Sequence, residues 1–208
     1  SPYHLTLNGQ WDFYYVMGEH ETPAGFLDAV GRQEAETGWS KIPVPGLWQL
    51  NGYGKPYYLA FAYPPAIETA KGKIPSIKAE WNEYGYYRMQ FHLPRHFENR
   101  RLILRFGAVK SAFYLYVNGA EVGYSQGSMT PASFDVSDYM LLGENTISVK
   151  VIRFSDGTYL EDQDMWFFSG IYREVCLIAE PHISINDVHA YALFDEQYKD
   201  ATLHVAIT

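Results

Sequence analysis

Residues 112–125 read AFYLYVNGAEVGYS and contain the clearest local fold signal of the chain. Apolar side chains fall on alternate positions here, which places them on one face of a β-strand: Phe113, Leu115 and Val117. An Asn118-Gly119 pair follows directly. Both central positions of a type I′ turn need a positive φ, and Asn and Gly adopt it most easily. The stretch therefore predicts a β-hairpin.

Strand patterns also occur on both sides of this hairpin. Alternating apolar residues mark the segments 9–16, 86–94, 101–106, 145–154 and 171–181. Convincing helical periodicity never exceeds a turn or two, and short helical turns are expected only near 26–30 and 136–142. The chain is therefore predicted to be all-β. About eight strands with long connections at one end favour a jelly-roll or an immunoglobulin-like β-sandwich, and periodicity alone does not separate them.

The sequence pattern restarts after Pro181. Two alternating runs, 188–193 and 202–207, flank a polar bend. Two strands do not form an independent domain. We therefore expect a first domain over residues 1–180 and, over 181–208, the opening hairpin of a second sandwich, so that the chain is a fragment of a larger protein.

Composition excludes some classes of partner. The 208 residues carry a formal net charge of −8, and no cluster of Lys and Arg is interleaved with aromatics, so nucleic acid is not an expected partner. No run approaches the roughly 18 apolar residues of a membrane span, so no membrane is expected either. The single cysteine, Cys176, lies in an apolar run and is interpreted as a buried, inert thiol. One thiol suits any compartment, so the localisation stays open.

Residues 153–170, RFSDGTYLEDQDMWFFSG, combine carboxylates with aromatics. Glu161, Asp162 and Asp164 are too close along the chain for a typical catalytic pair, so we expect them to fasten the return loop that ends this segment. We expect Trp166–Phe168 to bury the base of this return loop against the sandwich. Asp156 differs because it follows the end of an apolar strand. There a carboxylate could accept from a sugar hydroxyl or hold a hard cation, although a simple Asp-Gly turn is the alternative. Phosphate-loop, serine-nucleophile, zinc and EF-hand patterns are absent.

A long Gly- and Pro-rich stretch between the first strand and residue 86 is too long for an idle loop. Its aromatic residues are Trp48, Tyr53, Tyr57, Tyr58, Phe61 and Tyr63. They could form a stacking platform for sugar rings, or they could pack the loop onto the sandwich.

Several longer motifs together carry a family resemblance: LNGQWDFYY, GAVKSAFYLYVNGAEVGYSQGSMTPASFDVS and SDGTYLEDQDMWFFSGIYR. They resemble the N-terminal sugar-binding domain of glycoside hydrolase family 2, and within it most closely the large bacterial β-galactosidases. The resemblance implies a jelly-roll, or galactose-binding-like, β-sandwich for the first domain and the first strands of an immunoglobulin-like sandwich after it.

The resemblance also carries expectations about the site. The family's catalytic glutamates lie on a later (β/α)₈ barrel, so no catalytic residue is expected in this chain. Asp156 matches a carboxylate that helps to bind Na⁺ and contacts the galactosyl ring. Ala60, followed by Phe61 in the substrate-binding loop, stands where well-known members have an asparagine that touches the sugar. The resemblance thus implies Na⁺ at Asp156 in the full-length enzyme, allows Mg²⁺ in the missing barrel, and implies no cofactor for the isolated chain.

These observations lead to an expected function. The chain is interpreted as the non-catalytic N-terminal domain of a retaining β-galactosidase that hydrolyses terminal β-galactosides. Its expected partners are the substrate, the missing barrel and other domains of the same protein, and further copies in a homo-oligomer. The alternatives are an independent carbohydrate-binding module, the corresponding domain of a family 2 β-glucuronidase or β-mannosidase, and a purely structural assembly element.

Overall fold

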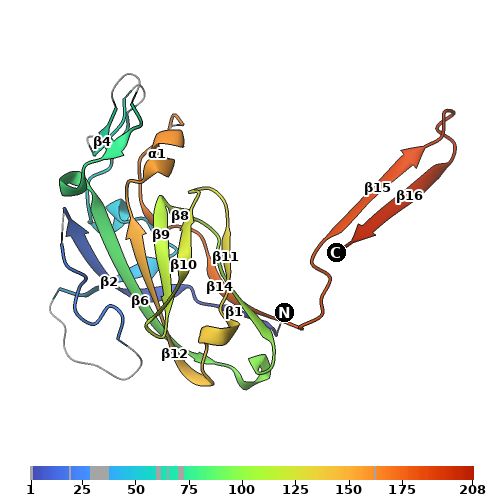
Figure 1. Cartoon of the computed structure of the whole chain (residues 1–208), viewed down its shortest axis with the longest axis horizontal. Coiled ribbons are helices and arrows are strands. Elements are labelled where there is room, and N and C mark those ends of the chain that lie inside the picture. Colours follow the sequence, from blue (N-terminus) through green and yellow to red (C-terminus); the bar gives the residue numbers. More distant parts are fainter. Residues whose placement is uncertain are drawn as a thin grey trace.

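The protein folds as a sandwich of two antiparallel sheets (Figure 1). The computed structural model describes residues 2–18, 20–28, 38–59, 62–64, 66–69, 73–161 and 163–208. The four-stranded sheet has the order β1-β14-β7-β11, from the strands His4–Thr6, Val175–Glu180, Arg101–Phe106 and Ala132–Asp135. The six-stranded sheet has the order β10-β9-β12-β6-β2-β3, from the strands Ala120–Gln126, Ala112–Val117, Gly143–Ile152, Glu83–Leu93, Gly9–Met17 and Ser40–Val44.

Smaller elements complete the described part of the chain. Three two-stranded pairs are β4 with β5 (Ile67–Glu68, Ser76–Ile77), β8 with β13 (Val109–Lys110, Gly170–Ile171) and β15 with β16 (Val188–Phe194, Ala201–Ile207). The α-helix α1 spans Asp156–Leu160, and the 3₁₀ turns η1 to η4 span Gln49–Asn51, Ala79–Trp81, Arg95–Phe97 and Ser137–Tyr139.

The predicted hairpin is confirmed. β9 and β10 pair in antiparallel register across Asn118 and Gly119, whose φ angles are 51° and 83°. Those two positive φ values are what a type I′ turn requires. The amide of Asn118 also donates to Asn145 Oδ1 and to Tyr139 O, both at 2.8 Å, which joins the turn to β12 and η4.

The core lies between the two sheets. Its fully buried members include Trp11, Phe13, Leu104, Phe106, Leu115, Val117, Ile147, Val149, Val151, Val175 and Leu177. These residues recur with period two along their strands because alternate side chains point to the same face. Neighbouring strands are often distant in sequence, as β1 beside β14 and β12 between β6 and β9 show. The expectation of an all-β jelly-roll sandwich is confirmed.

The two expected helical turns have different outcomes. The turn η4 lies inside the predicted 136–142. Of the predicted 26–30, residues 29 and 30 lie outside the described part of the chain, and residues 24–27 form a turn rather than a helix.

Cys176 is buried in β14, as expected, and burial raises the pKa of its thiol.

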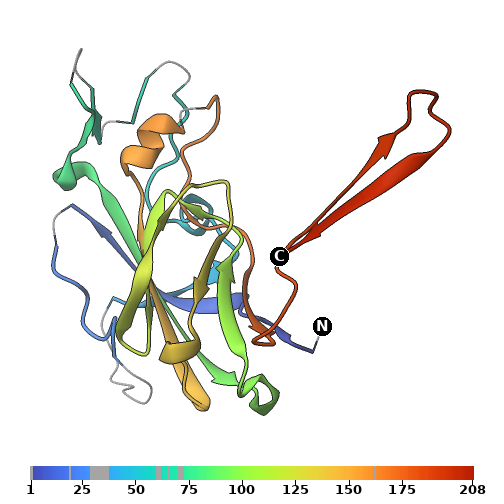
Figure 2. The ribbon, with the colours of Figure 1, turned by 45° about the vertical axis from the view of Figure 1, so that its right-hand side comes forward.

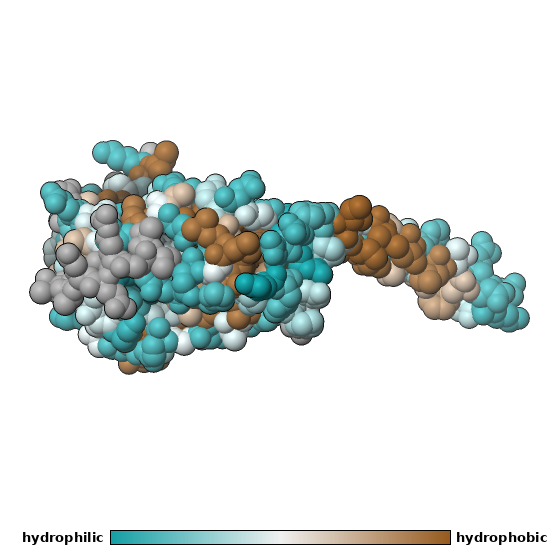
Figure 3. Space-filling model, turned by 90° about the horizontal axis from the view of Figure 1, so that it is seen from below, coloured by the Kyte–Doolittle hydropathy of each residue, from teal (hydrophilic) through white to brown (hydrophobic). Residues whose placement is uncertain are grey.

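The hairpin β15–β16 projects away from the sandwich, as two views show (Figures 1 and 2). Every residue from 181 to 208 is exposed. Its apolar side chains cover much of its surface in the space-filling view (Figure 3), and the large ones include Val188, Leu193, Phe194, Leu203, Val205 and Ile207. Two strands alone are marginally stable in water, so this hairpin needs a partner to bury its apolar surface.

Candidate functional site

Asp156 is the first residue of α1, the short helix that follows β12 at one end of the sandwich (Figure 1). The Asp156 side chain is exposed, and its Oδ1 accepts the Gly157 N–H at 2.9 Å. The preceding residue is tightly held, since the Ser155 N–H donates to Thr158 Oγ1 at 3.0 Å and the Thr158 N–H donates to Ser155 O at 3.0 Å. The backbone therefore fixes where this carboxylate is presented.

Polar groups of β10 lie near Asp156. The Tyr124 hydroxyl donates to Gln126 Oε1 at 2.8 Å, and a Cβ placed on Gly157 would lie 3.9 Å from that same oxygen. Burial raises the pKa of Tyr124, and the negative charge of Asp156 raises it further. Tyr124 and Gln126 could not be recognised from the sequence, because they become neighbours of Asp156 only when β10 pairs with β9.

The donor set suits part of a sodium shell. Hard cations prefer oxygen ligands, and Asp156, Gln126 and Tyr124 offer carboxylate, amide and hydroxyl oxygens on one rim. The residues that the structure describes contain no group of three or more His, Cys, Asp or Glu able to hold a metal ion. Any further ligands of a cation at Asp156 would therefore be groups other than such a cluster.

No helix in the described ranges is long and apolar enough to cross a membrane.

Glu161 and Asp164, two of the three acids expected to fasten the loop, do hold loop segments together. Glu161 accepts the Ser128 N–H at 2.7 Å and the Ser128 hydroxyl, which joins the end of α1 to the loop after β10. Asp164 accepts the Tyr58 hydroxyl at 2.6 Å, and this bond raises the pKa of Tyr58. Asp162 lies outside the described residues.

The aromatic residues of the long loop divide between core and surface. Trp48 is fully buried, and its ring packs against those of Phe13 and Tyr15. Tyr53 packs edge-on against Phe13, with ring centroids 4.8 Å apart. Tyr58, by contrast, is 49% exposed. Packing therefore explains the inner rings, while a stacking role remains open only for the outer ones.

The prediction that Trp166–Phe168 bury the base of the return loop is wrong in part. Phe167 is buried, but Trp166 is 50% exposed and stacks on Phe168 with an interplanar angle of 12°. Tyr58 lies beside Trp166, with ring centroids 5.6 Å apart, and the two residues form an antiparallel bridge. Alternation along an extended segment explains this result, because residues on either side of buried Phe167 face outward. The outer aromatic set is thus Tyr58, Trp166 and Phe168.

The long loop and the return loop run side by side. The Phe167 N–H donates to Tyr57 O, the Trp48 N–H to Ser169 O, and the Gly46 N–H to Ile171 O, each at 2.8 Å. The two loops come from distant parts of the sequence. Together they form one surface next to α1, which is called the wall below. Ala60 and Phe61, the two substrate-binding residues expected on the long loop, lie outside the described part of the chain.

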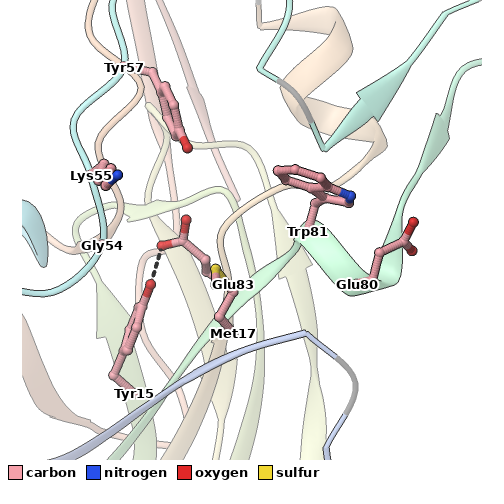
Figure 4. Close-up of a pocket in the computed structure, with 8 residues that line it drawn as sticks. All are labelled: Tyr15, Met17, Gly54, Lys55, Tyr57, Glu80, Trp81 and Glu83. Atoms are coloured by element: carbon pink, nitrogen blue, oxygen red, sulfur yellow. Dashed lines mark hydrogen bonds between the residues drawn. The ribbon is translucent and has the colours of Figure 1, made fainter.

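A cavity of about 640 Å³ opens beside these loops. The residues that line it are Tyr15, Met17, Gly54, Lys55, Tyr57, Glu80, Trp81 and Glu83 (Figure 4). Trp81 and Tyr57 face the cavity from two different segments, and Glu83 lies between Tyr57 and Tyr15. The Glu83 side chain is only 6% exposed, and it pairs with Arg153, whose side chain is fully buried. This ion pair was not among the sites expected from the sequence.

Lys110 is a second buried cation near the return loop. The residue is 6% exposed and lines an apolar pocket with Trp166 and Phe168. Its Nζ contacts the Met165 sulfur at 3.4 Å, which is a weak acceptor. Burial lowers the pKa of Lys110 from its usual 10.5, although the charge of Glu161 offsets part of that effect.

Lys110→Met should therefore stabilise the chain at neutral pH, by about 1 kcal/mol, because it removes a buried charge and keeps an apolar side chain of similar length. A lowered folded-state pKa means that folding disfavours the protonated amine. The free-energy cost of burying the protonated amine is complete at pH values below the folded-state pKa. It disappears as the pH rises toward 10.5, the pKa in the unfolded state. Urea unfolding of variant and wild type at pH 7 and pH 10 measures the difference, which should be smaller at pH 10. A variant less stable than wild type at pH 7 would contradict this prediction.

Comparison with known proteins identifies the family. The model of the glycosyl hydrolases family 2 sugar binding domain matches residues 5–181. The chain is 43% identical over 199 residues to a β-galactosidase of Alteromonas mediterranea and 40% identical over 205 residues to one of Psychromonas ingrahamii. These matches cover 96% and 99% of this chain but 18% and 19% of the relatives, so the chain spans about a fifth of their length. The chain belongs to the sugar-binding domain family of the family 2 glycosyl hydrolases.

Solved structures support the fold. The chain resembles a β-glucuronidase from an uncultured Clostridium species, with a TM-score of 0.65, 24% identity, and coverage of 99% of this chain and 33% of that one. It also resembles Bacteroides uniformis β-glucuronidase 2, covalently bound to cyclophellitol-6-carboxylate aziridine, with a TM-score of 0.68, 25% identity, and coverage of 97% and 21%. At such identities the likeness is evidence for the sandwich rather than for the substrate.

Proposed function

We propose that this chain is the N-terminal, non-catalytic domain of a longer β-galactosidase, to whose sugar and sodium pocket it contributes Asp156. One observation carries the proposal: Asp156 is exposed at the start of α1, shortly after β12 ends. The relatives named β-galactosidase align with nearly the whole of this chain. The catalytic groups, and any Mg²⁺, would lie in the part of the protein beyond these residues. Asp156 would orient the substrate rather than react with it.

The domain boundary is part of this proposal. The sugar-binding domain would comprise residues 1–180, and residues 181–208 would begin an immunoglobulin-like sandwich. The exposed apolar surface of β15–β16 supports the second half, since further strands of such a sandwich would cover it. The barrel, the other domains and further copies of the protein remain its proposed partners.

The outer aromatic set favours a second candidate function, an independent carbohydrate-binding module. Tyr58, Trp166 and Phe168 present aromatic faces on one surface, and half-exposed Tyr and Trp rings suit the apolar face of a sugar. Such a module would bind sugar without any barrel, whereas a domain that only completes a pocket would not.

One experiment compares the full-length protein with the 208-residue chain. We expect the full-length protein to hydrolyse an aryl β-galactoside faster than the matching β-glucuronide and β-mannoside, and the chain alone to hydrolyse none of them. Faster hydrolysis of the β-glucuronide or the β-mannoside would mean that the proposed substrate, a β-galactoside, is wrong. Calorimetric titration of the chain alone with galactose and lactose tests the second function, since binding between about 1 μM and 1 mM would support a module.

A further inference from the structure

We propose that the buried ion pair between Glu83 and Arg153 positions the candidate site by fixing the Asp156 segment and the long loop through one guanidinium. This inference rests on the proposed role of Asp156. It assigns a positioning function to two residues that lie 70 positions apart in the sequence.

The ion pair lies where β6 begins and the neighbouring strand β12 ends. Glu83 opens β6, and Arg153 directly follows β12, three residues before Asp156. The Arg153 N–H donates to Glu83 O at 2.9 Å. Next to it, the Asn82 side chain donates to Phe154 O at 2.9 Å and accepts the Phe154 N–H at 3.1 Å. The chain that leads to Asp156 is thus held at both Arg153 and Phe154.

The guanidinium of Arg153 reaches both loops. Its Nη2 donates to Lys55 O in the long loop and, at 3.0 Å, to Phe167 O in the return loop. Its Cζ also lies 5.0 Å from the ring centroid of Tyr57. One side chain therefore connects the end of β12 with both segments of the wall described above.

Glu83 holds that guanidinium in place. Nη1 of Arg153 lies 2.6 Å and 2.7 Å from the two Glu83 oxygens. Glu83 Oε2 also accepts the Tyr15 hydroxyl at 2.7 Å (Figure 4). The backbone of the long loop packs directly on the pair: a Cβ on Gly54 would lie 2.4 Å from Glu83 Oε2 and 3.0 Å from Arg153 Nη1. Gly54 also has a φ of +67°, which glycine adopts without strain.

Stability alone is a weak reason for such a pair. Burying two charges costs about as much as their attraction returns, so apolar residues of the same volume often serve the fold as well. An arginine offers something that they do not, because its planar fork binds a carboxylate and two carbonyl oxygens at the same time. Arg153 therefore links three segments: the end of β12, the long loop and the return loop.

The test uses four variants of the full-length protein, one of which, Asp156→Asn, reports on the proposed function itself. Glu83→Gln removes the charge that orients the guanidinium, and Arg153→Lys keeps the ion pair but loses the fork. Asp135→Asn is the control, because Asp135 pairs with Arg101 on the other sheet, in an exposed ion pair away from both loops. Hydrogen exchange followed by mass spectrometry reports on each loop, and steady-state kinetics with an aryl β-galactoside give kcat and KM separately.

We expect amides in residues 46–58 and 153–168 to exchange about tenfold faster in Glu83→Gln and Arg153→Lys, while β7 keeps its wild-type rate. Both variants should also raise KM about tenfold, and Asp135→Asn should change neither quantity. If Glu83→Gln fails to fold, Arg153→Lys alone decides. Faster exchange throughout the protein, or loosened loops with unchanged KM and kcat, would overturn the proposal. Because Asp156→Asn is measured beside them, a normal KM in that variant identifies failure of the proposed function instead.

Discussion

Asp156→Asn in the full-length protein should weaken sodium activation and substrate binding together, raising the half-activating Na⁺ concentration and the KM for an aryl β-galactoside by about 10- to 100-fold. The substitution removes the negative charge, which supplies most of the attraction for a cation at this rim. Asparagine keeps the Oδ1 atom that accepts the Gly157 N–H, so the start of α1 should remain intact. Initial rates measured over a series of NaCl concentrations, at constant ionic strength, give both quantities.

The control for this prediction comes from the same segment. Asp164→Asn also removes one carboxylate, but Asp164 accepts a hydrogen bond from Tyr58 and lies in the return loop beyond α1. We expect its Na⁺ dependence to equal that of the wild type. Equal effects of the two substitutions, or none from Asp156→Asn, would mean that Asp156 is an ordinary turn residue.

Trp48→Ala should lower the free energy of unfolding by about 3–5 kcal/mol, the largest stability loss that we expect from a single loop position. The ring of Trp48 is fully buried, and its Nε1 donates to the buried Tyr87 hydroxyl at 2.5 Å. Alanine leaves a cavity and removes one of the hydrogen bonds of the Tyr87 hydroxyl, which adds to the transfer cost. The loss should appear as a lower urea midpoint with an unchanged slope.

Tyr58→Ala provides the comparison, because Tyr58 belongs to the same loop but is half-exposed. Its loss should stay below about 1 kcal/mol. If the two substitutions destabilised the chain equally, Trp48 would not be the core residue that its burial indicates.

Local pattern was sufficient to predict the sandwich. The β9–β10 hairpin follows from alternation and from an Asn-Gly pair, both of which act within a few residues. The strands β6, β7, β12 and β14 follow from the same period-two rule, since each buries one face against the opposite sheet. The place of Asp156 at a strand end was also readable, because β12 is a long apolar strand that stops just before it.

The sequence also held an unused signal for the ion pair. The buried series of β12, Ile147, Val149 and Val151, continues with period two to Arg153. A cation at a position that the pattern buries requires a carboxylate partner. The pattern does not say which one, because 24 acidic residues are available in the chain. Only the antiparallel pairing of β12 with β6 brings Glu83 to that place.

The sequence by itself therefore determined the sandwich class, most of the longer strands and the strand that leads to Asp156. It did not predict β1, β3, β11 or the helix α1. The tertiary structure decided that Trp48 is core while Trp166 is surface, that Tyr124 and Gln126 accompany Asp156, and that Arg153 joins both loops. The physical reason is the distance along the sequence over which each effect acts. Strand periodicity and turn geometry act between residues a few positions apart, whereas burial of a loop residue and the choice of a charged partner depend on segments that meet only after the sheets have formed.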